Sequence, residues 1–465
     1  MHFPERIYGI ENEFGVAVRN TSGAFVECAD PPVWKLIQPI EYSIRNESPS
    51  PGRIWHSNGS CTYIDMGCHP EHATAECRSV RDVVRHNKAG EFLASRIFTR
   101  DIGIGELHLF KNNLGCNEEG AVKGEYGCHE NYLLRGQHAS DKAHIMELTP
   151  FLVSRQILDG SGWWEQQGAF LFSQRSLSIV ADIGAGTTNQ RPIINIKNTN
   201  DTGPGRLHLI LGDANILEFA LYLKIGTTSL VLSLLEARKM PSIICTNPVA
   251  AMRDIAKSYD ALEKTIHFRD CLKSPFDVQT IYWEAVKNEL PSASFGSEKI
   301  EAETHHIMLC WEQTLNAIYN RDTQWMLGRL DYATKKYLSD KEVRRRQPAD
   351  TDDLFSLRKD IDILYHGISD RTLQDRMNTA WSGRRLLTDK EIADAVIHPP
   401  SGTRAQLRGK LIQRMCAVDQ KSIFELDWIM CRFMLPKTQL HQFTFPDPFV
   451  SHSQAFNIFL TKMGI

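Results

Sequence analysis

The stretch Gly9-Ile10-Glu11-Asn12-Glu13-Phe14-Gly15 places two acidic residues two positions apart in an otherwise apolar, strand-like run. Residues i and i+2 of a β-strand point to the same face, so Glu11 and Glu13 project together between small residues. The opposite face is apolar apart from Asn12: it carries Tyr8, Ile10, Phe14, Val16 and Val18. Paired carboxylates on the free face of such a strand suit Mg²⁺, which prefers oxygen ligands. The alternative interpretation is a solvated face with two exposed acids.

A second group of polar residues follows some fifty positions later. Tyr63 and Asp65 share one face of a short strand bounded by glycines, where a substrate can approach the backbone closely. The next ten residues add three oxygen-bearing side chains: Glu71, Thr74 and Glu76. They also contain two cysteines and two histidines, but Cys68 and His69 are adjacent and no second pair has zinc-finger spacing. The sequence therefore favours an oxygen-ligated cation over zinc.

Three arginines flank later strand-like runs: Arg175, Arg191 and Arg206. The planar guanidinium group suits phosphate oxygens, although each of these residues taken alone is interpreted as a surface ion-pair residue. The chain contains no Walker loop, GxGxxG or GxSxG motif. Any phosphate binding is therefore expected to use a site other than a P-loop.

Other polar residues near the later strands have simpler interpretations. Asp213 and Asn215 come just before an apolar helix, and we interpret them as N-caps of that helix. We interpret His129 and His208 as core histidines rather than ligands. None of these four residues is assigned to the site.

The composition excludes several classes of function. The 465 residues include 53 Lys and Arg and 56 Asp and Glu, a balance that indicates neither a nucleic-acid partner nor a membrane surface. The 11 cysteines form no CxxC pair, which fits a reducing compartment. The long apolar run at 219–237 is interrupted by polar residues and predicts a buried helix rather than a membrane span. The first residues lack a signal-peptide pattern, so we expect a cytoplasmic protein.

The order of elements predicts an α+β fold. Short strand-like runs fill the first two hundred residues, with helices expected at 80–99 and 145–156, and the chain from Ile216 onward is predicted to be mainly helical. The segment His398-Pro399-Pro400-Ser401-Gly402 stops any helix. We therefore expect a catalytic domain at 1–397 and a small C-terminal domain at 398–465.

The sequence resembles the Pup ligase and depupylase family, a branch of the glutamine-synthetase-like carboxylate–amine ligases. The blocks that carry this resemblance span most of the chain and lie at residues 10–15, 58–65, 69–77, 126–133, 148–156, 173–175, 191–195, 212–228 and 399–409. The resemblance implies a curved antiparallel sheet cradle backed by helices, with a small C-terminal domain. It also implies ATP and Mg²⁺ as cofactors.

By this resemblance, most of the candidate residues acquire roles. Glu11, Tyr63 and Glu71 match positions that hold Mg²⁺, and Glu13 and Glu76 are expected to support a second ion or the shell of the first. Asp65 matches the catalytic base and Thr74 a nucleotide contact, although regular alternation places Glu71 and Thr74 on opposite faces. Arg191 or Arg206 is expected to stabilise the phosphoryl group. Trp428 is the candidate for stacking on the nucleotide, with Phe424 as the alternative.

The chain also departs from the family pattern. Cys61 stands where the ligases carry an arginine used for ATP, and residues 196–200 replace the Arg-Asp-Glu-Pro-His sequence. The interval between Arg19 and Ser57 is short, whereas depupylases carry a long loop there. We therefore expect a ligase closer to the Pup ligase branch, although residues 148–154 and 212–215 are more similar to the depupylase.

The expected reaction is the ATP-dependent joining of a Glu-terminated, Pup-like protein to lysine. Two alternatives remain open at this point. One is the same chemistry with a small carboxylic acid as acyl donor and a small amine as acceptor, and the other is a depupylase or deamidase that hydrolyses an amide. A fourth interpretation, an inactive nucleotide-binding regulator, is disfavoured because the acidic residues are all present.

Overall fold

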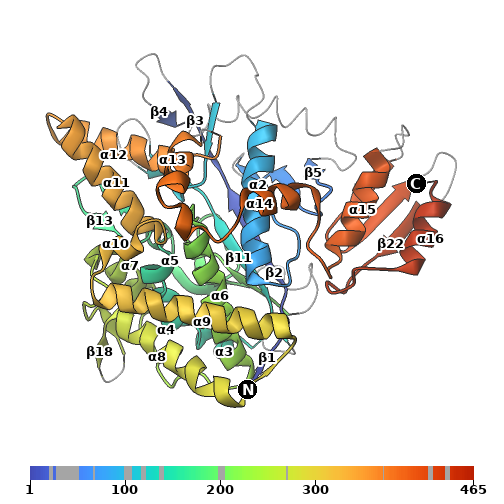
Figure 1. The fold of residues 1–465 in the computed structure, drawn as a ribbon, viewed down its shortest axis with the longest axis horizontal. Coiled ribbons are helices and arrows are strands. Elements are labelled where there is room, and N and C mark those ends of the chain that lie inside the picture. Colours follow the sequence, from blue (N-terminus) through green and yellow to red (C-terminus); the bar gives the residue numbers. More distant parts are fainter. Residues whose placement is uncertain are drawn as a thin grey trace.

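Among the residues that the structure describes, an open sheet of eight strands forms the centre of the protein (Figure 1). The computed structural model describes residues 1–19, 25–27, 52–65, 69–98, 107–116, 122–135, 141–196, 205–268, 271–369, 371–416, 423–434 and 440–464. Neighbouring strands of the sheet are antiparallel except for β14 and β15, which are parallel. In spatial order the strands are β14 (Ala181–Gly184), β15 (Pro192–Asn195), β16 (Arg206–Leu209), β11 (Cys128–Leu133), β2 (Tyr8–Glu13), β7 (Pro70–Ala73), β6 (Cys61–Ile64) and β5 (Arg53–Trp55).

The strand-like run at the start of the chain divides at Phe14. Residues before it belong to β2, and residues after it form β3 (Gly15–Arg19), which belongs to a second sheet with β4 (Phe25–Glu27) and β8 (Leu107–Phe110). A Cβ atom on Gly15 would lie only 2.1 Å from the ring of Phe110. Glycine is therefore required where the chain passes from one sheet to the other.

Two long helices pack behind the central sheet. Helix α2 (Val80–Phe98) confirms the helix expected at 80–99, and it lies against the apolar face of β2 (Figure 1). Asn12, the polar interruption on that face, donates a hydrogen bond of 2.6 Å from Nδ2 to Oδ1 of Asn87 on α2. Burying the amide therefore costs little, because its donor finds a partner.

Helix α6 (Glu218–Glu236) confirms the buried helix predicted at 219–237. Among the described helices, α6 alone has the length and apolar composition of a membrane span, yet its most apolar window is completely buried inside the protein. It packs against α2 and α9 (Glu298–Tyr319), so its apolar residues contribute to the main hydrophobic core. The composition of α6 reflects this central position.

Shorter helices surround this core. The helix expected at 145–156 is instead three short helices: α3 (Lys142–Met146), α4 (Thr149–Ser154) and α5 (Gln156–Asp159). The later helices follow the predicted helical region and are α7 (Pro248–Ser258), α8 (Pro275–Glu289), α10 (Thr323–Met326), α11 (Asp331–Arg346), α12 (Thr351–His366), α13 (Thr372–Ala380) and α14 (Asp389–Ile397). The remaining strands before residue 300 are short: β1 (His2–Phe3), β9 (Leu114–Cys116), β10 (Val122–Glu125), β12 (Trp163–Trp164), β13 (Phe170–Leu171), β17 (Ile266–His267), β18 (Leu272–Lys273) and β19 (Ser294–Phe295).

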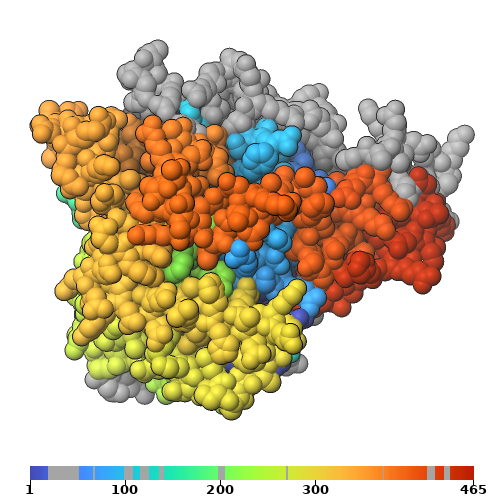
Figure 2. Space-filling model, in the orientation of Figure 1, coloured from blue at the N-terminus to red at the C-terminus, as the bar shows by residue number. Residues whose placement is uncertain are grey.

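The C-terminal elements form a lobe that projects to the right in Figures 1 and 2. They are α15 (Ala405–Cys416), β20 (Ile423–Leu426), β21 (Met430–Met434), β22 (Leu440–Thr444) and α16 (Gln454–Lys462). The chain after Ile216 is mainly helical, as predicted, but the lobe also contains a three-stranded antiparallel sheet that the sequence pattern did not reveal. Strand β22 has no fully buried position, so its sequence lacks the apolar alternation by which strands are recognised.

The lobe has a hydrophobic core of its own, but two members of that core come from the central sheet. Trp55 on β5 and Cys61 on β6 pack with residues of α15, β21 and α16, including Leu411, Phe433 and Leu460. The lobe therefore docks on the edge of the sheet that β5 and β6 form.

Candidate active site

The register of neighbouring strands brings most of the predicted metal ligands to one face of the sheet. Glu13 on β2 lies directly opposite Glu71 on β7, and Glu71 lies opposite Tyr63 on β6. Tyr63 in turn lies opposite Arg53 on β5. Because directly opposite residues of antiparallel strands share a face, these side chains form a row across four strands. Glu11, two positions before Glu13, lies on the same face.

The first acidic cluster consists of Glu13, Asp65 and Glu71, whose carboxylate oxygens lie within 4.8 Å of one another. Burial raises the pKa of Glu71 well above its usual range, and the charges of Glu13, Glu11 and Asp65 raise it further. Burial also raises the pKa of Glu13, but the hydrogen bond from His69 and nearby positive charges outweigh it and bring this pKa to about 2. Negative charge is therefore crowded here, and a cation would relieve the repulsion.

A second cluster combines Glu11 with two histidines. Oε2 of Glu11 lies 3.4 Å from Nδ1 of His129 and 3.8 Å from Nε2 of His208, and donor atoms of the three residues lie within 4.8 Å of one another. Burial alone would raise the pKa of Glu11, but the hydrogen bond from His129 and the charge of Arg206 hold it well below its usual range. Both histidines are buried, as expected of core residues, and they also line the same cavity as the acids.

This cavity has a volume of about 240 Å³, and its wall carries both acidic and basic side chains. Arg175, Arg191 and Arg206 all line it. Arg191 is held by Glu125 and donates from Nε to the carbonyl of Thr187 at 3.1 Å. Asp65 lies at an exposed position of the wall. Acids for a cation and arginines for phosphate oxygens therefore face a common space.

Arg175 is buried, and its position depends on Asp213. Its backbone N–H donates to Asp213 at 2.8 Å and its Nε donates to the carbonyl of Ile210 at 3.0 Å. The Asp213 carboxylate also accepts hydrogen bonds from Ser161 and Ser173. Interpreting Asp213 as an N-cap is therefore wrong, because its oxygens order the turn that carries Arg175.

Asn215 is not an N-cap either. Its Nδ2 donates to the carbonyl of Asp159 at 2.7 Å and to Asp331 at 2.9 Å. The N-cap of α6 is Leu217, which makes no side-chain capping bond. The amide therefore joins three segments of the core instead of ending a helix.

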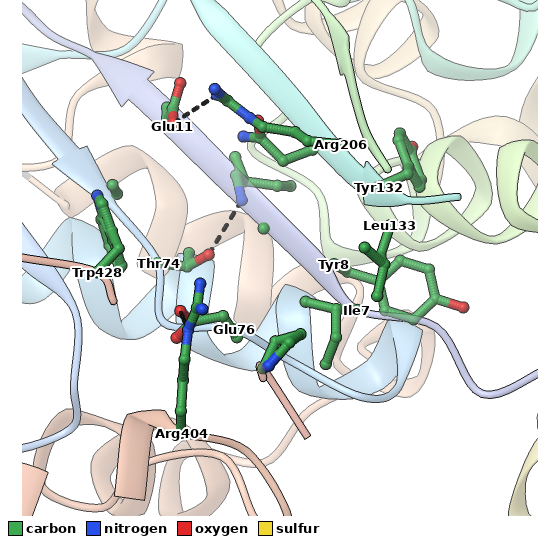
Figure 3. Close-up of a pocket in the computed structure, with 15 residues that line it drawn as sticks. Ile7, Tyr8, Glu11, Thr74, Glu76, Tyr132, Leu133, Arg206, Arg404 and Trp428 are labelled. Carbon is green, nitrogen blue, oxygen red and sulfur yellow. Dashed lines mark hydrogen bonds and ion pairs between the residues drawn. The ribbon is translucent and has the colours of Figure 1, made fainter. Parts of the chain in front are cut away.

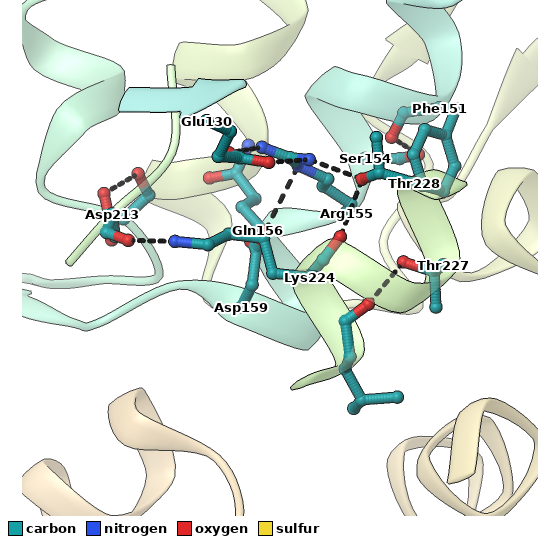
Figure 4. A network of polar contacts seen from close by, with 12 residues as sticks. Glu130, Phe151, Ser154, Arg155, Gln156, Asp159, Asp213, Lys224, Thr227 and Thr228 are labelled. Atoms are coloured by element: carbon teal, nitrogen blue, oxygen red, sulfur yellow. Dashed lines mark hydrogen bonds and ion pairs between the residues drawn. The ribbon is translucent and has the colours of Figure 1, made fainter. Parts of the chain in front are cut away.

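A buried polar network lies behind this part of the sheet (Figure 4). Glu130 and Arg155 form a two-pronged ion pair, and Nη1 of Arg155 also donates to the hydroxyl of Thr228 at 2.7 Å. Lys224 on α6 donates to the carbonyl of Asp213. Because Glu130 is the strand neighbour of His129, these contacts fix β11 from the side opposite the cavity.

A second cavity, of about 110 Å³, lies between the strand ends and the C-terminal lobe (Figure 3). Its wall is mostly apolar and includes Ile7, Leu133 and Trp428, with Thr74 and Glu76 among the polar members. The nucleotide candidates Thr74 and Trp428 are thus brought together here. The alternative candidate Phe424 has its side chain outside the part of the protein that the structure describes.

Thr74 lines this second cavity because it directly follows the last residue of β7, Ala73. The register of β7 is continuous, so Glu71 faces the acidic cavity as alternation requires. Thr74 lies beyond the strand, where its Oγ1 accepts a hydrogen bond of 3.0 Å from the backbone N–H of Ile10. The end of the strand therefore accounts for the positions of Glu71 and Thr74 without a bulge.

Glu76 is not brought to the acidic clusters. Its Oε1 accepts hydrogen bonds from Nε of Arg404 at 2.7 Å and Nη1 of Arg408 at 3.0 Å, and its Oε2 accepts from Nη2 of Arg408. Burial raises the pKa of Glu76, but these two arginines outweigh it and bring the pKa to about 2. The expectation of a metal-supporting role does not match this geometry, because both oxygens are engaged by guanidinium groups.

The sequence departs from the family pattern at Cys61 and at residues 196–200, and the structure describes the surroundings of Cys61. Cys61 is completely buried in the core of the C-terminal lobe, where burial raises the pKa of its thiol to about 12. The guanidinium carbon of Arg53, on the next strand, lies 5.6 Å from the centre of the Tyr63 ring. Residues 197–200 lie outside the described residues.

The sequence interpretation missed His129, His208 and the two arginines that hold Glu76. Alternation in the segment 128–133 already separates His129 and Asn131 from Cys128, Glu130 and Tyr132. That signal does not reveal that β11 pairs with β2, which is what sets His129 opposite Glu11. Pairing between strands more than a hundred residues apart is a property of the fold and not of either segment.

The chain thus has an open, mostly antiparallel sheet, and acidic and arginine side chains line one cavity beside it. A profile of the Pup-ligase protein family matches residues 6–432. The chain belongs to the Pup-ligase family. The sequence prediction of this family and of an α+β fold is thereby confirmed.

Individual relatives agree with this assignment. The chain is 32% identical to a Pup–protein ligase of Paenarthrobacter aurescens, over 99% of this chain and 100% of the relative. It is 30% identical to a Pup–protein ligase of Acidimicrobium ferrooxidans, over 98% of this chain and 99% of the relative. Neither relative favours the small-molecule ligase or the amide hydrolase.

Solved structures of Pup ligases also match this chain. A complex between the prokaryotic ubiquitin-like protein Pup and its ligase PafA matches with a TM-score of 0.84 and 27% identity, covering 99% of this chain and 92% of that chain. A structure of the Pup ligase PafA with ADP matches with a TM-score of 0.76 and 27% identity, covering 93% of this chain and 94% of that chain.

Proposed function

We propose that this protein is an ATP-dependent ligase that joins the terminal glutamate of a Pup-like protein to a lysine side chain. One observation carries the proposal: Glu13, Asp65 and Glu71 gather within 4.8 Å on a face of the sheet that also presents arginines to the same cavity. Its family membership and the ADP-bound relative support the use of a nucleotide. The Pup-bound relative supports a protein as acyl donor.

The residues present fit Mg²⁺. The donor atoms of the first cluster are all oxygens, and their crowding leaves an excess of negative charge. By the family resemblance, Glu11, Tyr63 and Glu71 would hold the ion, and Glu13, whose carboxylate lies within 4.8 Å of that of Glu71, would complete its surroundings. When bound, Mg²⁺ would align the phosphates of ATP and offset their charge.

The chemical problem is that a carboxylate and an ammonium do not condense in water. Transfer of the γ-phosphoryl group of ATP to the glutamate side chain replaces a poor leaving group with phosphate. Arg206 and Arg191 line the cavity and would stabilise the oxygens of the phosphoryl group as it is transferred. Arg175, fixed by Asp213, supplies a third positive charge to the same wall.

The second half-reaction needs a neutral amine, whereas a free lysine has a pKa of about 10.4. Asp65 is the exposed member of the acidic cluster and would accept the proton of the incoming lysine. Attack by the neutral amine then releases phosphate and forms the isopeptide bond.

Nucleotide binding is assigned to the second cavity. Thr74 and Trp428 line it, and its apolar wall suits the base of ATP. Glu11 and Arg206 line both cavities, so a nucleotide with its base in the second cavity would direct its phosphates toward the acids. A small C-terminal domain at 398–465 and a cytoplasmic location belong to the same proposal.

The test is to incubate the protein with ATP, Mg²⁺, a Pup-like protein ending in glutamate and a lysine-bearing target. ADP and a covalent conjugate should appear together in equal amounts, and mass spectrometry should locate the isopeptide bond at the terminal glutamate. A matched reaction with a Pup-like protein lacking that glutamate should give no conjugate. Conjugate-free ATP turnover, or amide hydrolysis without ATP, would contradict the proposal.

A further inference from the structure

Glu76 joins the central sheet to the C-terminal lobe. It lies just beyond β7, its side chain is only 9% exposed, and it pairs with Arg404 and Arg408 on or beside α15. Two positive charges thus converge on one carboxylate between two parts of the fold. A buried pair of this kind is strongly sensitive to the loss of one member, because the remaining charges lose their compensation.

Arg408 connects Glu76 to an aromatic residue. Its Nη1 donates to the carbonyl of Trp428 at 2.9 Å, and its Nη2 donates to the carbonyl of Gly59 at 3.0 Å. The guanidinium carbon lies 4.8 Å from the centre of the Trp428 ring and 5.5 Å from that of Trp55. Arg408 therefore holds both the backbone and the ring of Trp428, and Glu76 holds Arg408.

The two indoles also contact each other. The ring centres of Trp55 and Trp428 lie 4.9 Å apart at an angle of 73°, an edge-to-face arrangement. Trp55 belongs to β5, so the position of Trp428 is defined from the sheet as well as from the lobe. A small rotation of α15 would change the direction of the Trp428 ring relative to the strands.

Trp428 faces the 110 Å³ cavity, which Glu76 and Arg404 also line (Figure 3). The cavity wall is mainly apolar, and a flat aromatic ligand gains most from an indole that is already held in place. The close fit of the loop before β6 supports a fixed docking position: a Cβ atom on Gly59 would lie 2.8 Å from the carbonyl oxygen of Ala405 on α15.

We propose that Glu76 is a positioning residue that acts through Arg408 to fix Trp428, and thereby sets the affinity of the second cavity for an aromatic base such as the adenine of ATP. This inference rests on the proposed function, since it takes the second cavity as the site of the base. It assigns Glu76 to nucleotide affinity and not to metal binding.

The experiment measures the dissociation constant of ADP by calorimetry for the wild type, Glu76→Gln, Trp428→Ala and the double variant, at fixed Mg²⁺. Loss of base stacking should weaken ADP binding about 10-fold or more in each single variant. The double variant should bind ADP no more weakly than Trp428→Ala, because both changes act on the same contact. Glu425→Gln, which alters an exposed pair with Arg432 in the same lobe, is the matched control and should bind normally.

Arg408→Lys gives a second measurement if Glu76→Gln does not fold, as judged by thermal unfolding. Lysine keeps the positive charge but cannot contact Glu76, Gly59 and Trp428 together, so the same loss of ADP affinity is expected. Additive losses of ADP affinity in the double variant, or unchanged ADP binding in the folded single variants, would overturn the inference. A change in Mg²⁺ affinity with ADP affinity intact would instead support the metal role of Glu76. Failure of the wild type to bind ADP would contradict the proposed function itself.

Discussion

Glu11 and Arg206 form an ion pair with 3.4 Å between Oε1 and Nη2, and both side chains line the acidic cavity and the apolar cavity. The pair, which Figure 3 shows in the apolar cavity, is therefore shared by the two cavities. Arg206 is held from its other side by Asn131, which accepts a hydrogen bond of 2.7 Å from Nε. A ligand that spans both cavities must contact this guanidinium group.

Replacing Arg206 should damage catalysis more than folding. Arg206→Gln removes a positive charge from the place where phosphoryl oxygens are expected, so kcat/KM for ATP should fall by roughly 100-fold. Steady-state ADP release measures the effect. Arg432→Gln, in an exposed pair of the lobe, provides the comparison. Equal rates for wild type and Arg206→Gln would remove Arg206 from the mechanism.

Asp65 should separate conjugation from nucleotide binding. Asp65→Asn keeps the shape of the side chain but cannot accept a proton, so conjugate formation should fall by about 10²- to 10⁴-fold. ADP affinity should change less than about twofold, because the nucleotide candidates lie in the other cavity. Conjugate yield by gel and ADP binding by calorimetry are the two measurements. A parallel loss of both would show that Asp65 serves binding rather than proton transfer.

The ionised Glu71 side chain should destabilise the folded protein when no cation is bound. Its pKa is raised in the folded protein by burial and by its acidic neighbours, so its ionisation opposes folding above the unfolded pKa. Glu71→Gln should therefore stabilise the metal-free protein at pH 8 by about 1 kcal/mol. Urea unfolding in the presence of EDTA tests this. The same variant should lose Mg²⁺ binding, and a destabilised variant would contradict the picture of crowded charge.

Glu76 should give the opposite dependence on pH. Its pKa is about 2 in the folded protein, below the usual value, so the stabilisation from its two arginines is complete above about pH 4.5 and is lost as the pH falls toward 2. Glu76→Gln should cost on the order of 3 kcal/mol at pH 7, and the difference from wild type should shrink through this acid range. Urea unfolding at pH 7, 4 and 3 measures it. A constant difference at all three values would assign the loss to packing.

The local sequence pattern was sufficient to predict the acidic face of β2. It was not sufficient to predict which residues of the neighbouring strands lie beside that face. Alternation around Asn12 correctly separates Glu11 and Glu13 from the residues under α2, because that pattern depends only on strand geometry. Whether His129 faces those acids depends on β11 pairing with β2 in one register, which no local pattern specifies.

Two other differences between the prediction and the structure also arise from contacts between segments that are distant in the sequence. The sequence pattern predicts that Phe14 belongs to one continuous strand. In the structure, Phe110 approaches Gly15 closely and the chain passes into another sheet. Glu76 resembles the nearby acids in its sequence context, and only the docking of α15, more than three hundred residues later, provides the arginines that engage it. Long-range contacts decide both cases.

The placement of Trp55 and Cys61 within the core of the C-terminal lobe has a consequence for biosynthesis. During translation, the edge strand β5 emerges from the ribosome long before α15 and α16 are made, and until then its apolar side chains and open backbone remain uncovered. The nascent chain is therefore most vulnerable to aggregation in the interval between these two events. Chaperone capture of ribosome-bound intermediates should be strongest there.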